Sequence, residues 1–245
     1  MSPQTNLLIH GANRGLGQAL TAHYLLQPYT FIAAAVRDPS HSTSQSLLSL
    51  PKGHGSAIVL LKLDSLVEKD FNSAVEILKT EHGIKALDLV ISSAGIAKIA
   101  RIDELDIGEL KEHVEVNALG PVRLFQAMLP LLKKAKHPKF FVIGSMAGSV
   151  GQMSMYPYPN ASYSSSKAML NSLVRKIQME NPWLVALTLH PGWAQTDMGN
   201  EGAKAVGLGK AAVTVDDSIS GVLAIVSLIC DLGTEKWMLM MDFEA

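Results

Sequence analysis

The fold is decided by residues 7–17, which read Leu7-Leu8-Ile9-His10-Gly11-Ala12-Asn13-Arg14-Gly15-Leu16-Gly17. The apolar start of this stretch predicts a buried β-strand, and a helical pattern begins at the last two glycines. Glycine at 11, 15 and 17 lets the backbone turn sharply and approach a pyrophosphate held on the N–H groups of the helix start. The spacing is GxxxGxG, and glycine-rich turns also occur without ligands. The strand before it and the helix after it nevertheless favour a dinucleotide site.

Strand and helix patterns alternate along the whole chain. The candidate strands are Leu7–His10, Thr30–Val36, Ala57–Leu63, Leu87–Ser92, Lys139–Ile143, Val185–His190 and Trp237–Met241. The candidate helices are Gly15–Leu26, Val67–Glu81, Ile107–Lys134, Ser162–Asn181 and Val215–Cys230. Most strands are apolar on both faces, as expected where helices cover a parallel sheet on each side. We therefore expect an α/β fold with a parallel sheet of about seven strands, in one domain spanning residues 1–245.

The composition is that of a globular protein with no electrostatic preference for polyanions. Of 245 residues, 48% are hydrophobic and 18% are charged, and the net charge is −1. This balance gives no reason to expect binding to nucleic acid or to an anionic membrane. The N-terminus lacks the pattern of a signal peptide, and the longest apolar run, residues 219–230, is too short to span a membrane. With a single cysteine, Cys230, a cytoplasmic location is expected.

Two arginines indicate which dinucleotide the chain would bind. Arg14 lies inside the glycine-rich stretch, and Arg37 comes where the second strand ends. NAD-binding sites often carry an acidic residue at that strand end, whereas guanidinium groups suit the 2′-phosphate of NADP(H). The alternative is that both arginines are solvated surface residues, with Asp38 neutralising Arg37. We expect NADP(H).

A tyrosine and a lysine one helical turn apart are the candidates for acid–base chemistry. Tyr163 and Lys167 occupy positions i and i+4, which share one face of the predicted helix. A neighbouring ammonium group is expected to lower the pKa of the phenol toward the working range. The pair alone is a chance-level pattern, and exposed helix residues are the alternative.

Three other segments support a catalytic interpretation. Ser145 follows the fifth predicted strand, at the sheet edge where open α/β proteins bind ligands, and its hydroxyl can donate to a carbonyl oxygen. Asn117 lies within a predicted helix, where asparagine needs a polar partner. The segment from His190 to Met198 follows the sixth strand and can lie over the nicotinamide end of a cofactor.

Taken together and in this order, these motifs resemble the short-chain dehydrogenase/reductase family over nearly the whole chain. The resemblance implies a Rossmann-type, doubly wound sheet and a catalytic set made of Asn117, Ser145, Tyr163 and Lys167. It implies that Tyr163 protonates the forming alkoxide, that Ser145 polarises the carbonyl, and that Asn117 holds a water. The residues it implies for cofactor binding are Gly11, Asn13, Arg14, Gly15, Leu16, Gly17, Arg37, Asp64, Ser93, Ala94, Gly95, Tyr163, Lys167, Pro191, Gly192 and Thr196.

A narrower resemblance is carried by residues 191–199, which are similar to the sniffer-type and C-factor-like carbonyl reductases. The segment before Tyr163 is also similar to fungal aromatic-polyketide ketoreductases of the norsolorinic acid type. Its extra residues, within Gly151–Ser162, predict a flap over the substrate, and an ordinary surface loop is the alternative. The side chains expected to line an apolar pocket are Met153, Met155, Tyr156, Tyr158, Trp193 and Met198.

Besides these extra residues between Ser145 and Tyr163, the chain departs from the family pattern at two places. His10 stands where the family usually has threonine, and Ser92-Ser93 replaces the usual pair of asparagines. We interpret His10 and His190 as satisfied residues at strand ends, and we expect no metal because the histidines lack ligand spacing.

The leading hypothesis is an NADPH-dependent carbonyl reductase acting on a small-molecule ketone or aldehyde, bulky or aromatic in kind. One alternative is an NAD-dependent alcohol dehydrogenase, and another is a catalytically quiet NADP(H)-binding scaffold or regulator. The resemblance also implies a homodimer or homotetramer formed through the helices near 107–134 and 162–181, although monomers occur in this branch.

Overall fold

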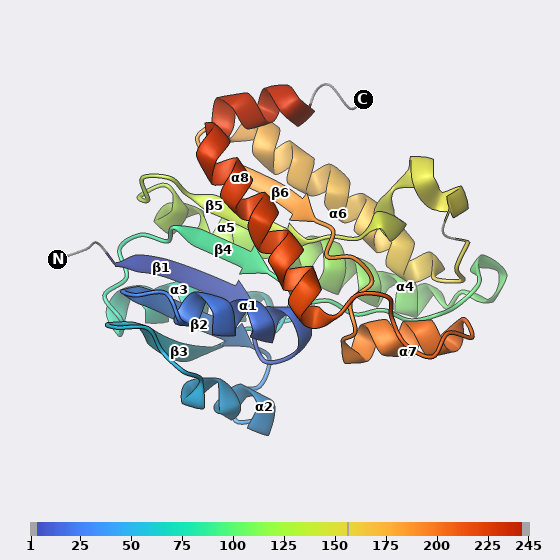
Figure 1. Ribbon diagram of the computed structural model, residues 1–245, viewed down its shortest axis with the longest axis horizontal. Coiled ribbons are helices and arrows are strands. Elements are labelled where there is room, and N and C mark those ends of the chain that lie inside the picture. Colours follow the sequence, from blue (N-terminus) through green and yellow to red (C-terminus); the bar gives the residue numbers. More distant parts are fainter. Residues whose placement is uncertain (1–3, 156, 242–245) are drawn as a thin grey trace.

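The computed structural model describes residues 4–155 and 157–241, and the side-chain surroundings of these residues as far as residue 228. Within that part, parallel strands form one six-stranded sheet in the order β3-β2-β1-β4-β5-β6, as Figure 1 shows. The strands are β1 Thr5–His10, β2 Thr30–Val36, β3 Ala57–Lys62, β4 Leu89–Ser92, β5 Lys139–Ile143 and β6 Val185–Leu189. After β3 the chain crosses to the other side of β1, so strand order reverses between β1 and β4. Ligands of such sheets bind beside this reversal, at the carboxyl ends of the strands.

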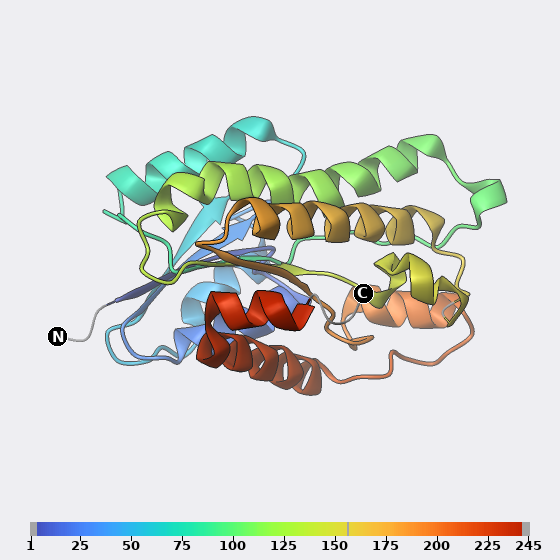
Figure 2. The same cartoon turned by 90° about the horizontal axis from the view of Figure 1, so that it is seen from above.

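Helices cover both faces of the sheet (Figure 2). One face carries α3 Glu68–Thr80, α4 Ile107–Val114, α5 Gly120–Leu132 and α6 Ala161–Glu180. The other face carries α1 Gly15–Leu25 and α8 Val215–Met241, which contact each other. The short α2 Ser42–Gln45 lies between β2 and β3, and α7 Asp197–Ala205 lies beyond the carboxyl ends of the strands (Figure 1). The predicted doubly wound arrangement is therefore confirmed.

The core is divided by the sheet into two apolar clusters. Phe140 and Phe141 are neighbours on β5, both fully buried, and they belong to opposite clusters. This alternation follows from the two-residue period of a strand. On α3, Phe71, Val75 and Leu78 recur at helical spacing and pack into the first cluster. Burying side chains of this size stabilises the fold by roughly 1.5–3 kcal/mol each.

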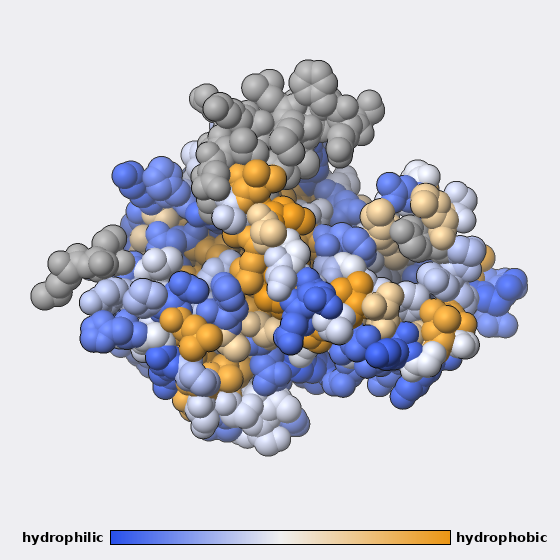
Figure 3. Space-filling view, viewed as in Figure 1, coloured by the Kyte–Doolittle hydropathy of each residue, from blue (hydrophilic) through white to orange (hydrophobic). Residues whose placement is uncertain are grey.

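The predicted seventh strand at residues 237–241 is wrong. These residues continue α8, which runs from Val215 to Met241 and so extends past the predicted end at Cys230. Leucine and methionine have high helix propensity and the run has no β-branched residue, so local preference favours a continued helix. Apolar content alone does not separate a short strand from part of a helix. Apolar side chains remain on the surface along the first part of α8, where Ile225 and Leu228 are exposed (Figure 3).

The single helix predicted for residues 107–134 is interrupted. A π-helical segment, η3 Glu115–Leu119, separates α4 from α5, and the N–H of Gly120 bonds to the carbonyl of Glu115 five residues earlier. Pro121 follows at once and has no N–H to continue the α-helical pattern, which favours the wider turn. The π-segment carries Asn117, and such bulges often occur at functional sites. No helix of the described residues meets the length and apolarity needed to cross a bilayer.

Candidate active site

The glycine-rich loop brings three separate segments together at the carboxyl ends of β1 and β4. Gly11 has φ +78°, and a Cβ atom there would lie 2.6 Å from the amide nitrogen of Ala94. A Cβ atom on Gly17 would collide with the carbonyl oxygen of Gly11. Gly15 has φ +54°, and a Cβ atom there would lie 3.1 Å from the methyl carbon of Thr196. The glycines thus permit a backbone cradle of the kind that a pyrophosphate needs.

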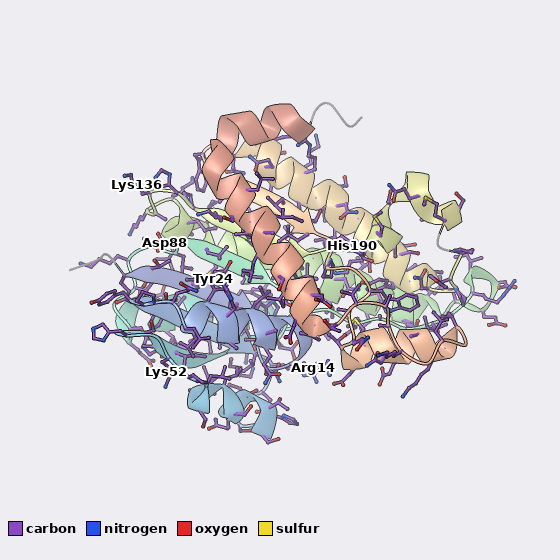
Figure 4. All side chains as sticks on the ribbon, viewed as in Figure 1. Arg14, Tyr24, Lys52, Asp88, Lys136 and His190 are labelled. Carbon is purple, nitrogen blue, oxygen red and sulfur yellow. The ribbon has the colours of Figure 1, made fainter. Side chains whose placement is uncertain are left out.

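The two arginines beside this loop are exposed and have no ion pair among the described residues. The alternative in which Asp38 neutralises Arg37 is not observed. Asp38 instead accepts hydrogen bonds from the hydroxyl of Ser40 at 2.6 Å and from its amide at 2.9 Å, and these lower the pKa of the carboxyl. Figure 4 labels Arg14 at the loop that precedes α1. Both guanidinium groups therefore remain available to an anion.

Tyr163 and Lys167 share one face of α6, as predicted. The Lys167 Nζ lies 5.8 Å from the centre of the Tyr163 ring. Lys167 is almost fully buried, and its Nζ donates a hydrogen bond to the carbonyl of Ile143 at 2.7 Å. Burial lowers the pKa of Lys167 to about 8. No ion pair of the described part of the chain includes Lys167, so no carboxylate there neutralises its charge.

The direction of the Tyr163 pKa shift is opposite to the predicted one. Burial raises the pKa of Tyr163, and a hydrogen bond with Ser145 opposes that effect. Desolvation of the phenolate therefore outweighs the hydrogen bond in this structure. A raised pKa keeps the phenol protonated at neutral pH, which suits a proton donor.

Asn117 is fully buried and joins three elements. Its Oδ1 accepts from the amide of Ile96 at 2.9 Å, and its Nδ2 donates to the carbonyl of Ile96 at 2.9 Å and to the Ser166 hydroxyl at 3.0 Å. Ser166 in turn donates to the carbonyl of Tyr163 at 2.7 Å. The polar partner that Asn117 was expected to need is present. Both N–H groups of the side chain are used, so Asn117 fixes the segment after β4 against the start of α6.

Ser145 begins a tight turn directly after β5. Its hydroxyl oxygen accepts from the amide of Ala147 at 3.2 Å, at the start of η4 Met146–Gly148. Gly148 lies against α6, because a Cβ atom there would be 2.6 Å from the carbonyl carbon of Lys167. The turn therefore packs onto the same stretch of helix that carries Tyr163 and Lys167.

The segment for which a flap or a surface loop was expected lines a cavity, and the described residues that line it do not include Ser145, Tyr163 or Lys167. The flap contains η5 Val150–Met155, and Asn160 pairs with Ala100 in an isolated β-bridge. The cavity has a volume of about 310 Å³ and is lined by Ala100, Arg101, Ile102, Ala147, Met153, Tyr158, Pro159, Asn160, Ala161, Ser164 and Ser165. The ring centroids of Tyr158 and Trp193 lie 5.2 Å apart, so residues 151–162 contact the segment after β6. Met155 is exposed, and Tyr156 lies outside the described residues.

The sequence model for short chain dehydrogenases matches residues 5–206, which contain every segment described above. The chain belongs to the short-chain dehydrogenase family. It is therefore an oxidoreductase of a family that binds a nicotinamide cofactor. The match includes the glycine loop, Asn117, Ser145 and the Tyr163–Lys167 pair, and it ends within the turn after α7.

This short-chain dehydrogenase is similar to fungal and animal proteins over most of its length. It is 38% identical over 227 residues to a norsolorinic acid ketoreductase of Dothistroma septosporum, covering 91% of this chain and 84% of that protein. It is 37% identical over 223 residues to the norsolorinic acid ketoreductase of Emericella nidulans, covering 90% and 84%. The crystal structure of NADPH-bound carbonyl reductase from chicken fatty liver superposes with a TM-score of 0.79 at 31% identity, covering 92% of this chain and 88% of that one.

Two of the residues that depart from the family pattern, His10 and Ser92, lie on neighbouring strands. His10 and Ser92 are paired in register on β1 and β4, and both are buried. Within the described residues, the His10 Nδ1 and the Ser92 hydroxyl have no hydrogen-bond partner. The prediction that His10 is fully satisfied is therefore wrong, although its ring bonds to the backbone of Leu63. Burial lowers the pKa of His10 to about 4, so the ring is neutral at physiological pH.

Three contacts at the site were not predicted from the sequence. Ser166 bonds to Asn117, Thr43 accepts from the Asn13 amide at 2.8 Å, and the His190 ring accepts from the amide of Met146 at 3.2 Å. Serine, threonine and histidine at these positions carry no distinctive spacing. Only the position of Ser166 between Tyr163 and Lys167 offered a signal.

Proposed function

We propose that this short-chain dehydrogenase reduces a bulky aromatic ketone with NADPH, and that Tyr163 is the proton donor. The observation that carries the proposal is the buried pair of Tyr163 and Lys167. Ser145 is hydrogen-bonded to the phenol, and no carboxylate of the described residues pairs with the lysine. An ammonium without a carboxylate partner retains its full effect on a charge that develops nearby. In this proposal, residues 1–245 work as one dinucleotide-binding and catalytic domain.

The residues at the carboxyl ends of β1 and β4 fit a dinucleotide. The backbone cradle of Gly11, Gly15 and Gly17 would hold the pyrophosphate, with Asn13 and Leu16 in the same loop. Arg14 and Arg37 would pair with the 2′-phosphate, because neither is neutralised in the described part of the chain. The remaining proposed cofactor contacts are Asp64, Ser93, Ala94, Gly95, Pro191, Gly192, Thr196 and the two catalytic side chains of α6.

Bound NADPH would supply the hydride. The Ser145 hydroxyl would donate a hydrogen bond to the carbonyl oxygen as negative charge develops there. Tyr163 would then give its phenolic proton to that oxygen, and the Lys167 ammonium would stabilise the phenolate that remains. Asn117 would keep the π-segment, the loop after β4 and the start of α6 at fixed positions, since its side-chain donors are already engaged.

The proposed substrate class follows from the cavity and from the relatives. Ala147, Met153 and Tyr158 contribute to the wall of the cavity, and Trp193 contacts Tyr158. Ala147 lies two residues after Ser145, and Ser164, which also lines the cavity, directly follows Tyr163. Aromatic side chains at a cavity favour stacking with planar ring systems. The relatives at 37–38% identity are named as ketoreductases of norsolorinic acid, which supports an aromatic ketone as the substrate.

We also propose association through the helices near 107–134 and 162–181. Ile107 on α4 and Met179 on α6 are exposed, which supports an apolar contact there. Sedimentation velocity at micromolar concentration is expected to show a dimer or tetramer, and a monomer alone would refute this part of the proposal.

The test of the function is NADPH oxidation at 340 nm with aliphatic, aryl and polycyclic ketones, with NADH in parallel. We expect turnover of the aryl or polycyclic ketones and a preference for NADPH. NADPH binding measured by fluorescence, without turnover of any ketone, would instead support the catalytically quiet alternative. Preference for NADH would support the alcohol dehydrogenase.

A further inference from the structure

His190 lies at the junction of the two segments that surround the proposed reaction centre. It directly follows β6 and directly precedes Pro191-Gly192, where nicotinamide contacts are proposed. Figure 4 labels His190 at the end of β6, at the edge of the sheet where the strands end and where Arg14 also lies. Its ring turns toward the neighbouring strand, where the Nδ1 accepts a hydrogen bond from the amide of Met146 at 3.2 Å. Met146 is the residue that follows Ser145.

The turn that carries Ser145 is held from outside through this bond. The amide of Ala147 bonds to the Ser145 hydroxyl, the amide of Gly148 to the Ser145 carbonyl, and the amide of Ser149 to the Met146 carbonyl. These three bonds lie within the turn. The amide of Met146 instead bonds to the side chain of His190, which directly follows β6, so this bond links the turn to the end of a neighbouring strand.

The segment after His190 is itself anchored. The Ser218 hydroxyl donates to the carbonyl of Pro191 at 2.6 Å, and the amide of Val213 donates to the carbonyl of Trp193 at 2.9 Å. His190 therefore links a fixed segment to the Ser145 turn. The bond needs an unprotonated Nδ1. His190 is an exposed residue, and partial desolvation of its ring lowers the pKa of His190, which favours the neutral ring at pH 7.

We propose that His190 is a positioning residue for the reduction, holding the Ser145 hydroxyl at a fixed distance from the nicotinamide segment through the amide of Met146. This inference rests on the proposed function, because Ser145 must act on the substrate for its position to matter. His190 itself touches no reacting atom. Its loss is expected to affect the rate of the chemical step more than cofactor binding.

The experiment compares His190→Leu, which removes the acceptor, with His190→Asn, whose Oδ1 can occupy the position of Nδ1. His137→Leu is the matched control, since His137 is exposed in the loop before β5. We expect His190→Leu to lower kcat about tenfold, because a donor displaced from a developing oxyanion loses much of its effect. The KM for NADPH should change by less than about twofold in all variants, and His190→Asn should recover most of kcat.

Amide exchange of Met146, followed by NMR, reports on the hydrogen bond independently of activity. We expect exchange to become at least about tenfold faster in His190→Leu and to stay near the wild-type rate in His190→Asn. Wild-type exchange in His190→Leu, no rescue by Asn, or a KM for NADPH that rises as kcat falls would overturn the inference. If the wild-type protein reduced no ketone, the proposed function and the positioning role would both fail. The exchange rates would then report only on the hydrogen bond itself.

Discussion

The cofactor half and the catalytic half of the proposed site are built in different ways. In the cofactor half, the groups expected to contact the dinucleotide are the backbone of the glycine loop and two arginines. Both arginines are exposed and have no ion pair in the described chain. In the catalytic half, Asn117, Ser166 and Lys167 are buried and hydrogen-bonded to one another or to the backbone. The cofactor half presents the charges of Arg14 and Arg37 at the solvent-exposed surface. The catalytic half holds the Lys167 ammonium in a buried, hydrogen-bonded environment. Substitutions in the two halves should therefore differ in what they change.

The largest effect is expected at Tyr163. Tyr163→Phe removes the phenolic proton and should lower kcat about 10³-fold, the usual size of a general-acid contribution. NADPH affinity, measured by fluorescence titration, should stay within about threefold of wild type. An unchanged kcat would show that Tyr163 is not the proton donor. A parallel loss of cofactor affinity would remove the distinction between the two halves.

Substitution of Lys167 should lower activity and raise stability. Lys167→Met is expected to lower kcat about 10²-fold, because the phenolate left on Tyr163 loses its nearby charge. Burial lowers the pKa of Lys167 to about 8 from its ordinary value of 10.5. Keeping the lysine charged at pH 7 therefore destabilises the folded protein. Because Lys167→Met removes the buried charge, it should raise the free energy of unfolding at pH 7 by about 1–3 kcal/mol.

The pH dependence of that gain tests its cause. Between about 8 and 10.5 the unfolded chain holds a proton on Lys167 that the folded chain has released, so wild-type stability rises with pH in this window. The gain in the free energy of unfolding of Lys167→Met over wild type should be largest below pH 8 and should decrease toward pH 10.5. Urea unfolding of both proteins across this range measures it. A difference that does not vary with pH would contradict desolvation as the cause.

Arg37 should affect the choice of cofactor and little else. Arg37→Asp is expected to raise the KM for NADPH about 10–100-fold, through the lost charge-assisted hydrogen bonds and added repulsion. The KM for NADH should not rise, and kcat should change little. Lys69→Asp, at an exposed position on α3, is the control for charge reversal alone. An unchanged KM for NADPH would refute the assignment of Arg37.

The smallest effect is expected in the flap. Tyr158→Ala removes the contact with Trp193 and one wall of the cavity, and should raise the KM for polycyclic ketones about 3–10-fold, the size of an aromatic pair interaction. Small aliphatic ketones should be unaffected. Met155→Ala is the matched control, because Met155 is exposed on the same flap and does not line that cavity. Equal effects of both substitutions would indicate a general loosening of the flap.

The sequence predicted the parts of the fold that depend on short-range pattern. The alternation of apolar strands with helices predicted the parallel sheet, and the strand–glycine–helix order predicted how residues 7–17 fold. The same approach failed at residues 237–241, where apolar content did not separate strand from helix, and at Asn117, where Pro121 four residues later disrupts the helical pattern.

For the site, the sequence identified residue types but not their surroundings. The pKa of Tyr163 depends on burial, which outweighs the neighbouring polar groups and was not visible from the i, i+4 spacing. The contact between His190 and Met146 joins residues 44 positions apart. Such a contact depends on β5 and β6 being neighbours in the sheet, and no local pattern reports it.

The most direct test of the account is the fate of the hydride. NADPH labelled with deuterium on both faces of C4 would be incubated with an aryl ketone and the wild-type protein, and the alcohol would be analysed by mass spectrometry and NMR. We expect one deuterium in the alcohol, located at the carbinol carbon, and almost no labelled alcohol from Tyr163→Phe in the same time. An alcohol without deuterium, or bound NADPH that reduces no ketone, would contradict the account.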